Sequence, residues 1–304
     1  MYRKIMGFLE AWKENEHRKP LILQGARQVG KTYSILEFGR SHYENVAYFN
    51  FETNPKLNET FDENISPDYL IPILSHIAGQ TIVREKTLIV FDEVQLCERA
   101  LTSLKYFCED APGYHIAALG SLLGVAAGRK RFSFPVGKVD MKTLYPMDME
   151  EFMLAVGEDA LAGKIKECFE TDTPMPSALH DAAMQLYRQY LVVGGMPECV
   201  LQFAQTKDYI LVRHTQDTIL ASYLNDMSKY NSVSEIKKTR LAYDNITVQL
   251  SKKNTCFQYK LIKKGGRASE FENAIEWLCL SGIVSQVYKV EQIKKPLENY
   301  RDID

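Results

Sequence analysis

Residues 25–32 combine glycine, lysine and threonine at a spacing that can hold a phosphate group. The pattern G-x-x-x-x-G-K-S/T is matched without exception by Gly25, Ala26, Arg27, Gln28, Val29, Gly30, Lys31 and Thr32. In this Walker A pattern, the glycines let the backbone wrap a β-phosphate so that successive N–H groups point at its oxygens. The lysine reaches the β- and γ-phosphates, and the hydroxyl is a magnesium ligand. We therefore predict that this loop binds ATP with Mg²⁺, that Lys31 also acts in catalysis, and that Thr32 contacts the metal.

Two adjacent carboxylates, Asp92 and Glu93, follow the apolar run Leu88–Phe91. At the end of a buried strand beside the loop, Asp92 would hold the magnesium ion as a Walker B residue. Glu93 would face the γ-phosphate and polarise an attacking water as a general base. This pair favours hydrolysis over transfer to a small molecule. The alternative, a solvated Asp-Glu pair at a strand end, is weaker beside a phosphate loop.

A γ-phosphate sensor and an arginine finger each have candidate residues, and each candidate also has an alternative explanation. Ser121 ends the apolar run that starts at His115, and in P-loop ATPases a polar residue at such a strand tip senses the γ-phosphate. An ordinary serine at a strand-to-loop junction is the alternative. The basic cluster 129–131 could supply positive charge to the transition state, as could Arg27, but a solvated surface run explains the cluster equally well. We therefore assign no arginine finger.

The elements that must position these residues alternate between strand and helix. Apolar runs occupy residues 21–23, 88–91 and 115–119, and residues 46–51 are β-branched and aromatic. Strands of this kind are buried on both faces, which is typical of a parallel sheet covered by helices. Helical lengths between them predict a doubly wound α/β domain. Residues 3–16 are expected to form an amphipathic helix before it.

The character of the sequence changes after Pro146, which predicts two domains, residues 1–146 and 147–304. Helical periodicity covers 148–170 and 177–230, with a proline-containing loop over 171–176. We expect several short helices over 232–290 and a strand-like run over 282–288. The Gly194-Gly195-Met196-Pro197 stretch is interpreted as a structural bend between helices rather than as a chemical site.

Composition narrows the class of protein further. The 304 residues are 45% hydrophobic and 25% charged, which excludes a disordered chain, a collagen-like repeat and a disulfide scaffold. The six cysteines are scattered, with no C-x-x-C pair. Neither a signal peptide nor an apolar run long enough to cross a bilayer is evident. We therefore expect a cytoplasmic protein without a membrane partner.

The formal net charge of −2 conceals a basic segment. Residues Lys229–Arg267 contain ten Lys and Arg against two acidic residues, a net charge of +8. Short helices and a turn at 264–267 suit a winged-helix-like segment over about 230–290, in which a helix enters the DNA major groove and the wing touches phosphates. The alternatives are a contact with the acidic remainder of the protein, with another copy or another protein, or no role.

Later blocks of the chain resemble a known family. Leu144-Tyr-Pro-Met-Asp-Met-Glu-Glu-Phe152 and Tyr190-Leu-Val-Val-Gly-Gly-Met-Pro-Glu-Cys-Val200 are its most specific blocks, and Gln249–Tyr259 and Glu276–Ile283 follow. Together with the loop and the acidic strand, they resemble the large prokaryotic family of predicted AAA+ ATPases. In that family a P-loop domain precedes a helical domain of unknown function.

The resemblance implies an AAA+ sheet followed by a mainly helical domain with a winged-helix-like part. It carries over Lys31 and Thr32 as phosphate and magnesium contacts, Asp92 and Glu93 as the acidic pair, and Ser121 as the sensor. Family members usually continue beyond the block that ends at Tyr300 into a nuclease-like module. The resemblance therefore leads us to expect that this chain, which ends at Asp304, lacks that module.

The sequence thus predicts an ATPase that hydrolyses Mg-ATP, with a turnover that can be low. Its nucleotide state would be coupled to a helical domain, for which DNA binding is one of the candidate roles. The alternative is a nucleotide-dependent switch or protein-binding module with little turnover. A small-molecule kinase is a distant third, because no acceptor-binding insert is evident. The sequence leaves the oligomeric state and the biological process open.

Overall fold

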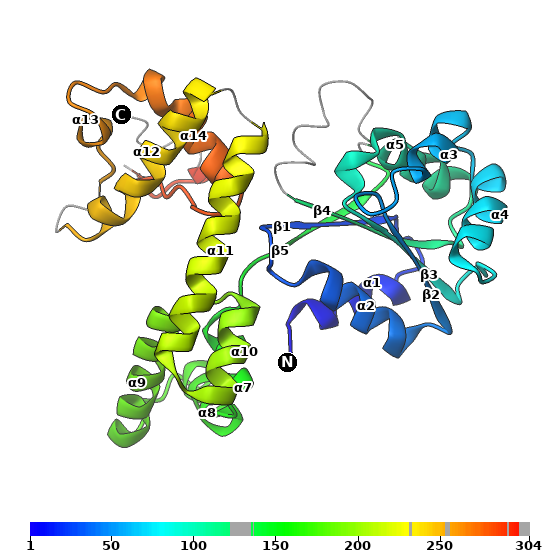
Figure 1. Cartoon of the computed structure of the whole chain (residues 1–304). Coiled ribbons are helices and arrows are strands. Elements are labelled where there is room, and N and C mark those ends of the chain that lie inside the picture. Colours follow the sequence, from blue (N-terminus) through cyan, green and yellow to red (C-terminus); the bar gives the residue numbers. More distant parts are fainter. Residues whose placement is uncertain (122–134, 136, 231–232, 253–255, 291, 298–304) are drawn as a thin grey trace. The chain divides into compact units, whose positions relative to one another are not determined.

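The four strands that the sequence predicts lie in one parallel sheet (Figure 1). The strands are β1 (Leu21–Gly25), β2 (Asn45–Asn50), β3 (Thr87–Asp92), β4 (His115–Ser121) and β5 (Asp140–Leu144). Their order in the sheet is β2-β3-β4-β1-β5. Every residue of β3 is buried, as its apolar run predicts. The short β5 is half-exposed and was not expected from the sequence.

The computed structural model describes residues 1–121, 135, 137–230, 233–252, 256–290 and 292–297. The basic cluster 129–131, considered above as a source of an arginine finger, lies outside these residues. Within them, none of the helices combines the length and the apolar composition needed to cross a membrane.

Helices cover both faces of the sheet (Figure 1). On one side lie α1 (Ile5–Glu14) and α2 (Lys31–His42), and on the other lie α3 (Leu57–Glu63), α4 (Pro67–Ala78) and α5 (Glu98–Asp110). A short 3-10 turn, η1 (Val94–Leu96), joins β3 to α5. This is the doubly wound arrangement that the alternating pattern predicts.

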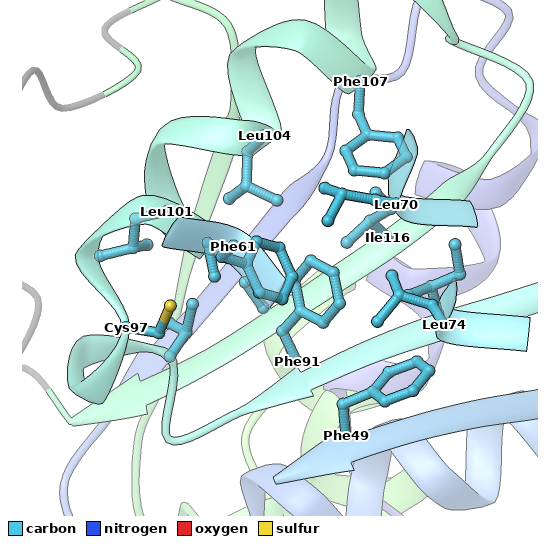
Figure 2. Close-up of a cluster of buried hydrophobic side chains, with 14 of the residues drawn as sticks. Phe49, Phe61, Leu70, Leu74, Phe91, Cys97, Leu101, Leu104, Phe107 and Ile116 are labelled. Carbon is cyan, nitrogen blue, oxygen red and sulfur yellow. The ribbon is translucent and has the colours of Figure 1, made fainter. Parts of the chain in front are cut away.

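An aromatic cluster packs between β3 and the helices α3, α4 and α5 (Figure 2). Phe61 of α3 meets Phe91 of β3 edge to face, with ring centroids 5.6 Å apart. Phe51 contacts both rings. Burying a phenylalanine side chain contributes about 1.5–3 kcal/mol. The cluster therefore fixes the end of β3, from which the two carboxylates extend.

The chain continues as helices after β5. They are α7 (Met149–Ala155), α8 (Asp159–Glu170), α9 (Ser177–Val193), α10 (Pro197–Thr206) and α11 (Tyr209–Tyr230). The loop predicted over 171–176 is present between α8 and α9. Asp148 begins α7 with a capping box, in which its side chain accepts from the Glu151 N–H and the Glu151 side chain accepts from the Asp148 N–H.

The described chain divides into a first unit, Met1–Asp226, and a second unit, Met227–Asp304. The second unit contains α12 (Val233–Leu250), α13 (Tyr259–Ile262) and α14 (Ala268–Leu280). At 18 residues, α12 is longer than the short helices expected there. The domain boundary predicted after residue 146 stays a prediction.

The strand-like run expected over 282–288 is not a strand. Residues 283–289 have no regular secondary structure, and Val287 is 93% exposed. A strand needs a hydrogen-bonded neighbour, and the described part of the second unit contains no sheet to supply one. The winged-helix-like interpretation therefore stays a prediction.

The Gly194-Gly195 bend serves packing. Gly194 ends α9 at φ 75°, a left-handed conformation that favours glycine. The Gly195 carbonyl accepts a hydrogen bond of 2.6 Å from the Met147 N–H. A Cβ on Gly195 would collide with the Met147 carbonyl. These contacts support the structural interpretation of this stretch.

Replacing Gly195 with alanine should lower the free energy of unfolding by about 2 kcal/mol or more, because backbone must shift to admit the methyl group. Gly163→Ala in α8 is the matched control, since open space surrounds that position and alanine favours helix by up to about 1 kcal/mol. Urea unfolding of both variants measures the difference. Equal stability of the two variants would contradict the packing role.

Candidate nucleotide site

The loop of residues 25–30 follows β1, an interior strand of the sheet, at the carboxyl end of that strand. Gly25 ends β1 and pairs with Ser121 of β4 on one side and with Leu144 of β5 on the other. A Cβ at Gly25 would overlap the Leu144 carbonyl, so only glycine fits this turn. Gln28 and Gly30 have φ values of 62° and 88°. Left-handed residues within such a turn orient backbone N–H groups into an anion-binding concavity.

Lys31 begins α2 and folds back over the loop. Its Nζ donates to the carbonyls of Gly25 at 3.0 Å and Ala26 at 2.8 Å. Burial lowers the pKa of Lys31, and the carboxylates of Glu93 and Asp92 act in the opposite direction. An ammonium has three protons, so two bonds to the loop leave one for a phosphate oxygen.

Thr32 and Asp92 meet as the sequence analysis expected. The Thr32 hydroxyl donates to Asp92 Oδ2 at 2.9 Å, although the residues lie 60 positions apart. Asp92 is buried at the end of β3, and its other oxygen, Oδ1, accepts the Glu93 N–H at 2.9 Å. The carboxylate is therefore held in one orientation beside the first turn of α2.

Tyr48 and Asn50 of β2 complete this cluster and were not expected from the sequence. The Tyr48 hydroxyl donates to Asp92 Oδ2 at 2.7 Å, and the Asn50 side chain donates to the Tyr48 oxygen at 3.2 Å. Burial raises the pKa of Tyr48 to about 12, and the Asp92 carboxylate adds to the shift. Tyr48 thus stays a proton donor to Asp92 throughout the neutral range. No local sequence signal marks this contact, because it depends on the register in which β2 pairs with β3.

Glu93 leaves the strand in a left-handed conformation, with φ 53°. This turn separates its side chain from the strand and starts η1. The Gln95 side-chain amide donates to Glu93 Oε2, an interaction that sequence reasoning also missed. A left-handed glutamate is uncommon, and strained backbone of this kind clusters at functional sites.

Two family models match separate parts of the chain. Residues 17–153 match the family described as an AAA domain. These residues form an AAA domain. Residues 184–301 match a domain of unknown function. None of the curated proteins matches the chain.

Solved structures that cover most of the chain have low sequence identity to it. The Walker-type ATPase paby2304 of Pyrococcus abyssi superposes with a TM-score of 0.52 at 14% identity, covering 92% of this chain and 89% of that one. The Aeropyrum pernix ORC2 protein, solved as ADPNP-ADP complexes, gives a TM-score of 0.44 at 14% identity, covering 93% and 87%. At 14% identity, the likeness to the Pyrococcus abyssi protein concerns the fold alone.

Ser121, the expected sensor residue, lies at the end of β4. It is the last residue of β4, which runs between β3 and β1, and it is half-buried opposite Gly25. The sheet thus brings the loop, Asp92 and Ser121 to one edge. Arg27 lies within the loop, and its carbonyl accepts a hydrogen bond from Tyr223 of α11.

The donor set of the AAA domain suits a magnesium ion. Mg²⁺ prefers oxygen ligands and is usually held by one or two carboxylates together with waters and substrate phosphates. Thr32 Oγ1 and Asp92 Oδ2 offer a hydroxyl and a carboxylate already in contact. Among the described residues, no group of three or more His, Cys, Asp or Glu side chains could hold a metal by itself. A metal here would therefore depend on the phosphates of the nucleotide.

Proposed function

We propose that this protein hydrolyses Mg-ATP at the AAA domain, with the phosphates bound by residues 25–32. The observation that supports this best is the contact between Thr32 and Asp92 directly before Glu93. It joins the start of α2 to the end of β3, so that one edge of the sheet presents a phosphate loop, a metal-binding pair and a base. The alternative is a nucleotide-dependent switch or protein-binding module with the same site and little turnover.

Each residue then has a defined task. The loop N–H groups and the Lys31 ammonium bind the β- and γ-phosphate oxygens and offset the charge that develops as the γ-phosphoryl leaves. Thr32 and Asp92 would hold magnesium, which would offset the negative charge of the phosphates. Glu93 accepts a proton from the attacking water, and Ser121 contacts the γ-phosphate. Gln95 donates a hydrogen bond to one carboxylate oxygen of Glu93. The attacking water must therefore bind to the other oxygen, or the Glu93 side chain must rotate away from Gln95.

Two measurements on the purified protein test the proposal. Isothermal titration with ATP, in Mg²⁺ and in EDTA, reports binding, and release of inorganic phosphate reports turnover. Binding with Mg-dependent phosphate release supports the ATPase. Binding with no release supports the switch, and the absence of binding contradicts both.

A second candidate function, contact with DNA, is favoured by exposed cations of the second unit. They gather on α12 and on the segment around α13: Lys237, Arg240, Lys252, Lys260, Lys263, Lys264 and Arg267. The following helix, α14, carries Glu270, Glu272 and Glu276 instead. An acidic helix does not suit an approach to the DNA backbone. We therefore infer that α12 and the 263–267 turn would contact DNA phosphates. In this arrangement α14 would not enter a groove to contact bases.

Replacing Lys263, Lys264 and Arg267 with alanine should weaken binding to duplex DNA at low salt. It should also flatten the plot of log affinity against log salt, by about 0.9 for each DNA phosphate that the protein no longer neutralises. Replacing three exposed cations of the first unit, Arg40, Lys56 and Lys166, is the matched control. Fluorescence anisotropy across a salt series measures both. If the wild type does not bind duplex DNA at low salt, the basic segment does not contact DNA, and a protein contact or no role remains.

A further inference from the structure

Two buried side chains outside the loop donate hydrogen bonds to its carbonyl groups. The Tyr223 hydroxyl donates to the Arg27 carbonyl at 2.8 Å, and Arg3 Nη1 donates to the Val29 carbonyl at 2.9 Å. Tyr223 is 8% exposed and Arg3 is 5% exposed. The Arg3 bond is buried and the Tyr223 bond is partly buried, and a hydrogen bond shielded from water is electrostatically stronger.

These bonds determine where the neighbouring N–H groups point. A peptide unit is planar and trans, so its N–H points opposite to its carbonyl. Fixing the Arg27 carbonyl toward Tyr223 turns the Gln28 N–H to the far side of that peptide. The Val29 carbonyl and the Gly30 N–H are related in the same way. Both N–H groups belong to the loop that is proposed to bind the phosphates.

Arg3 is itself held rigidly. Its Nε lies 3.2 Å from Glu151 Oε1, and its Nη2 donates to the Tyr145 carbonyl at 2.7 Å. Glu151 also accepts the backbone N–H of Lys4 at 2.7 Å. Two partners outside the loop therefore fix the plane of the guanidinium, and little rotamer entropy remains to be lost when it holds the loop.

Tyr223 holds the other peptide from a different helix. It lies on α11, far along the chain from the loop, and its contact spans 196 positions. Arg3 is anchored to α7 through Glu151. Pro197, the first residue of α10, lies 3.7 Å from the position that a Cβ on Gly30 would take. The outer side of the phosphate loop is thus lined by groups that come from, or are anchored to, the helices after β5.

We propose that Tyr223 and Arg3 are positioning residues for nucleotide binding, which hold the N–H groups of Gln28 and Gly30 toward the β-phosphate. The inference rests on the proposed function of the loop and names residues that act through its backbone. Because the β-phosphate is common to ATP and ADP, both nucleotides depend on this contact. Proton transfer to Glu93 does not depend on this contact, so the turnover of bound ATP is independent of Tyr223 and Arg3.

Tyr223→Phe tests the proposal, because it removes one hydroxyl and keeps the ring. We expect ATP and ADP to bind about three- to tenfold more weakly, as for the loss of one hydrogen bond. We expect kcat at saturating ATP to stay within about twofold. Tyr190→Phe is the matched control, since the Tyr190 hydroxyl donates to the Met147 carbonyl at the same 2.8 Å but does not contact the loop. Its nucleotide affinity should equal that of the wild type.

Arg3→Lys gives an independent second test. Lysine keeps the positive charge beside Glu151, but one ammonium cannot reproduce the three-sided contact of a guanidinium. ADP affinity should fall at least as far as in Tyr223→Phe, and thermal unfolding checks that the variant is folded at the assay temperature.

Wild-type affinity in Tyr223→Phe overturns the proposal, as does an equal loss in Tyr190→Phe, which would reveal a general effect of destabilisation. If the wild type binds ADP and only the variants' stability changes, the positioning role fails while the proposed function stands. If the wild type binds no nucleotide, the proposed function fails first, and the inference with it.

Discussion

Glu93→Gln should lower kcat for ATP hydrolysis by about 10²- to 10⁴-fold and leave the affinity for Mg-ATP within about twofold. Glutamine has the shape of glutamate but cannot accept the proton of the attacking water. Binding is spared because the phosphates are held by the loop, Lys31 and Thr32. Single-turnover phosphate release measures the first effect, and isothermal titration measures the second.

Glu98→Gln is the matched control for Glu93→Gln. It makes the same chemical change in the first turn of α5, five positions further along the chain. Its hydrolysis rate should equal that of the wild type. Undiminished hydrolysis in Glu93→Gln would remove this residue from the mechanism. Loss of ATP binding in the same variant would indicate that Glu93 supports the site structurally.

Lys31→Ala should weaken ATP binding by about tenfold to 150-fold, the loss expected for a hydrogen bond to a charged group. The ammonium is held between the loop carbonyls and the acidic strand end, where it can reach a phosphate oxygen. ADP binding should also fall, but less, because ADP lacks the γ-phosphate. Isothermal titration with both nucleotides measures the difference.

Lys56→Ala controls for the loss of one positive charge, since Lys56 is exposed at the start of α3. Circular dichroism must accompany both titrations, because removing Lys31 takes away an opposite charge beside Asp92 and Glu93. A folded Lys31→Ala protein that binds ATP like the wild type would contradict the assignment of the loop.

The core of the site was predictable because its signals are local in sequence. The loop, the acidic pair and the buried strands are contiguous patterns, and each lies in the structure where its pattern indicates. Bringing them together needed only the rule that ligands bind at the carboxyl ends of parallel strands. By contrast, β5 has no apolar run, since it is half-exposed at the edge of the sheet, and it was missed.

The supporting residues were not predictable for a different reason. Tyr48 meets Asp92 only because β2 pairs with β3 in one register, with Asn50 opposite Asp92. Arg3 and Tyr223 reach the loop across 26 and 196 positions. Nothing in their local sequence marks these contacts. The strand predicted over 282–288 was wrong for the opposite reason. Its residues have the composition of a strand, but the described chain offers them no partner strand.

Mg-dependent release of phosphate from ATP by the wild-type protein is the most direct test of ATP hydrolysis at this site. The assay compares the wild type, Lys31→Ala and Glu93→Gln in Mg²⁺ and in EDTA, over a range of protein concentrations. We expect release by the wild type that requires Mg²⁺. We expect it to be lost in Lys31→Ala because ATP binds weakly, and in Glu93→Gln because the base is missing. Release that persists in both variants, or a wild type that binds Mg-ATP and never releases phosphate, would contradict hydrolysis at this site.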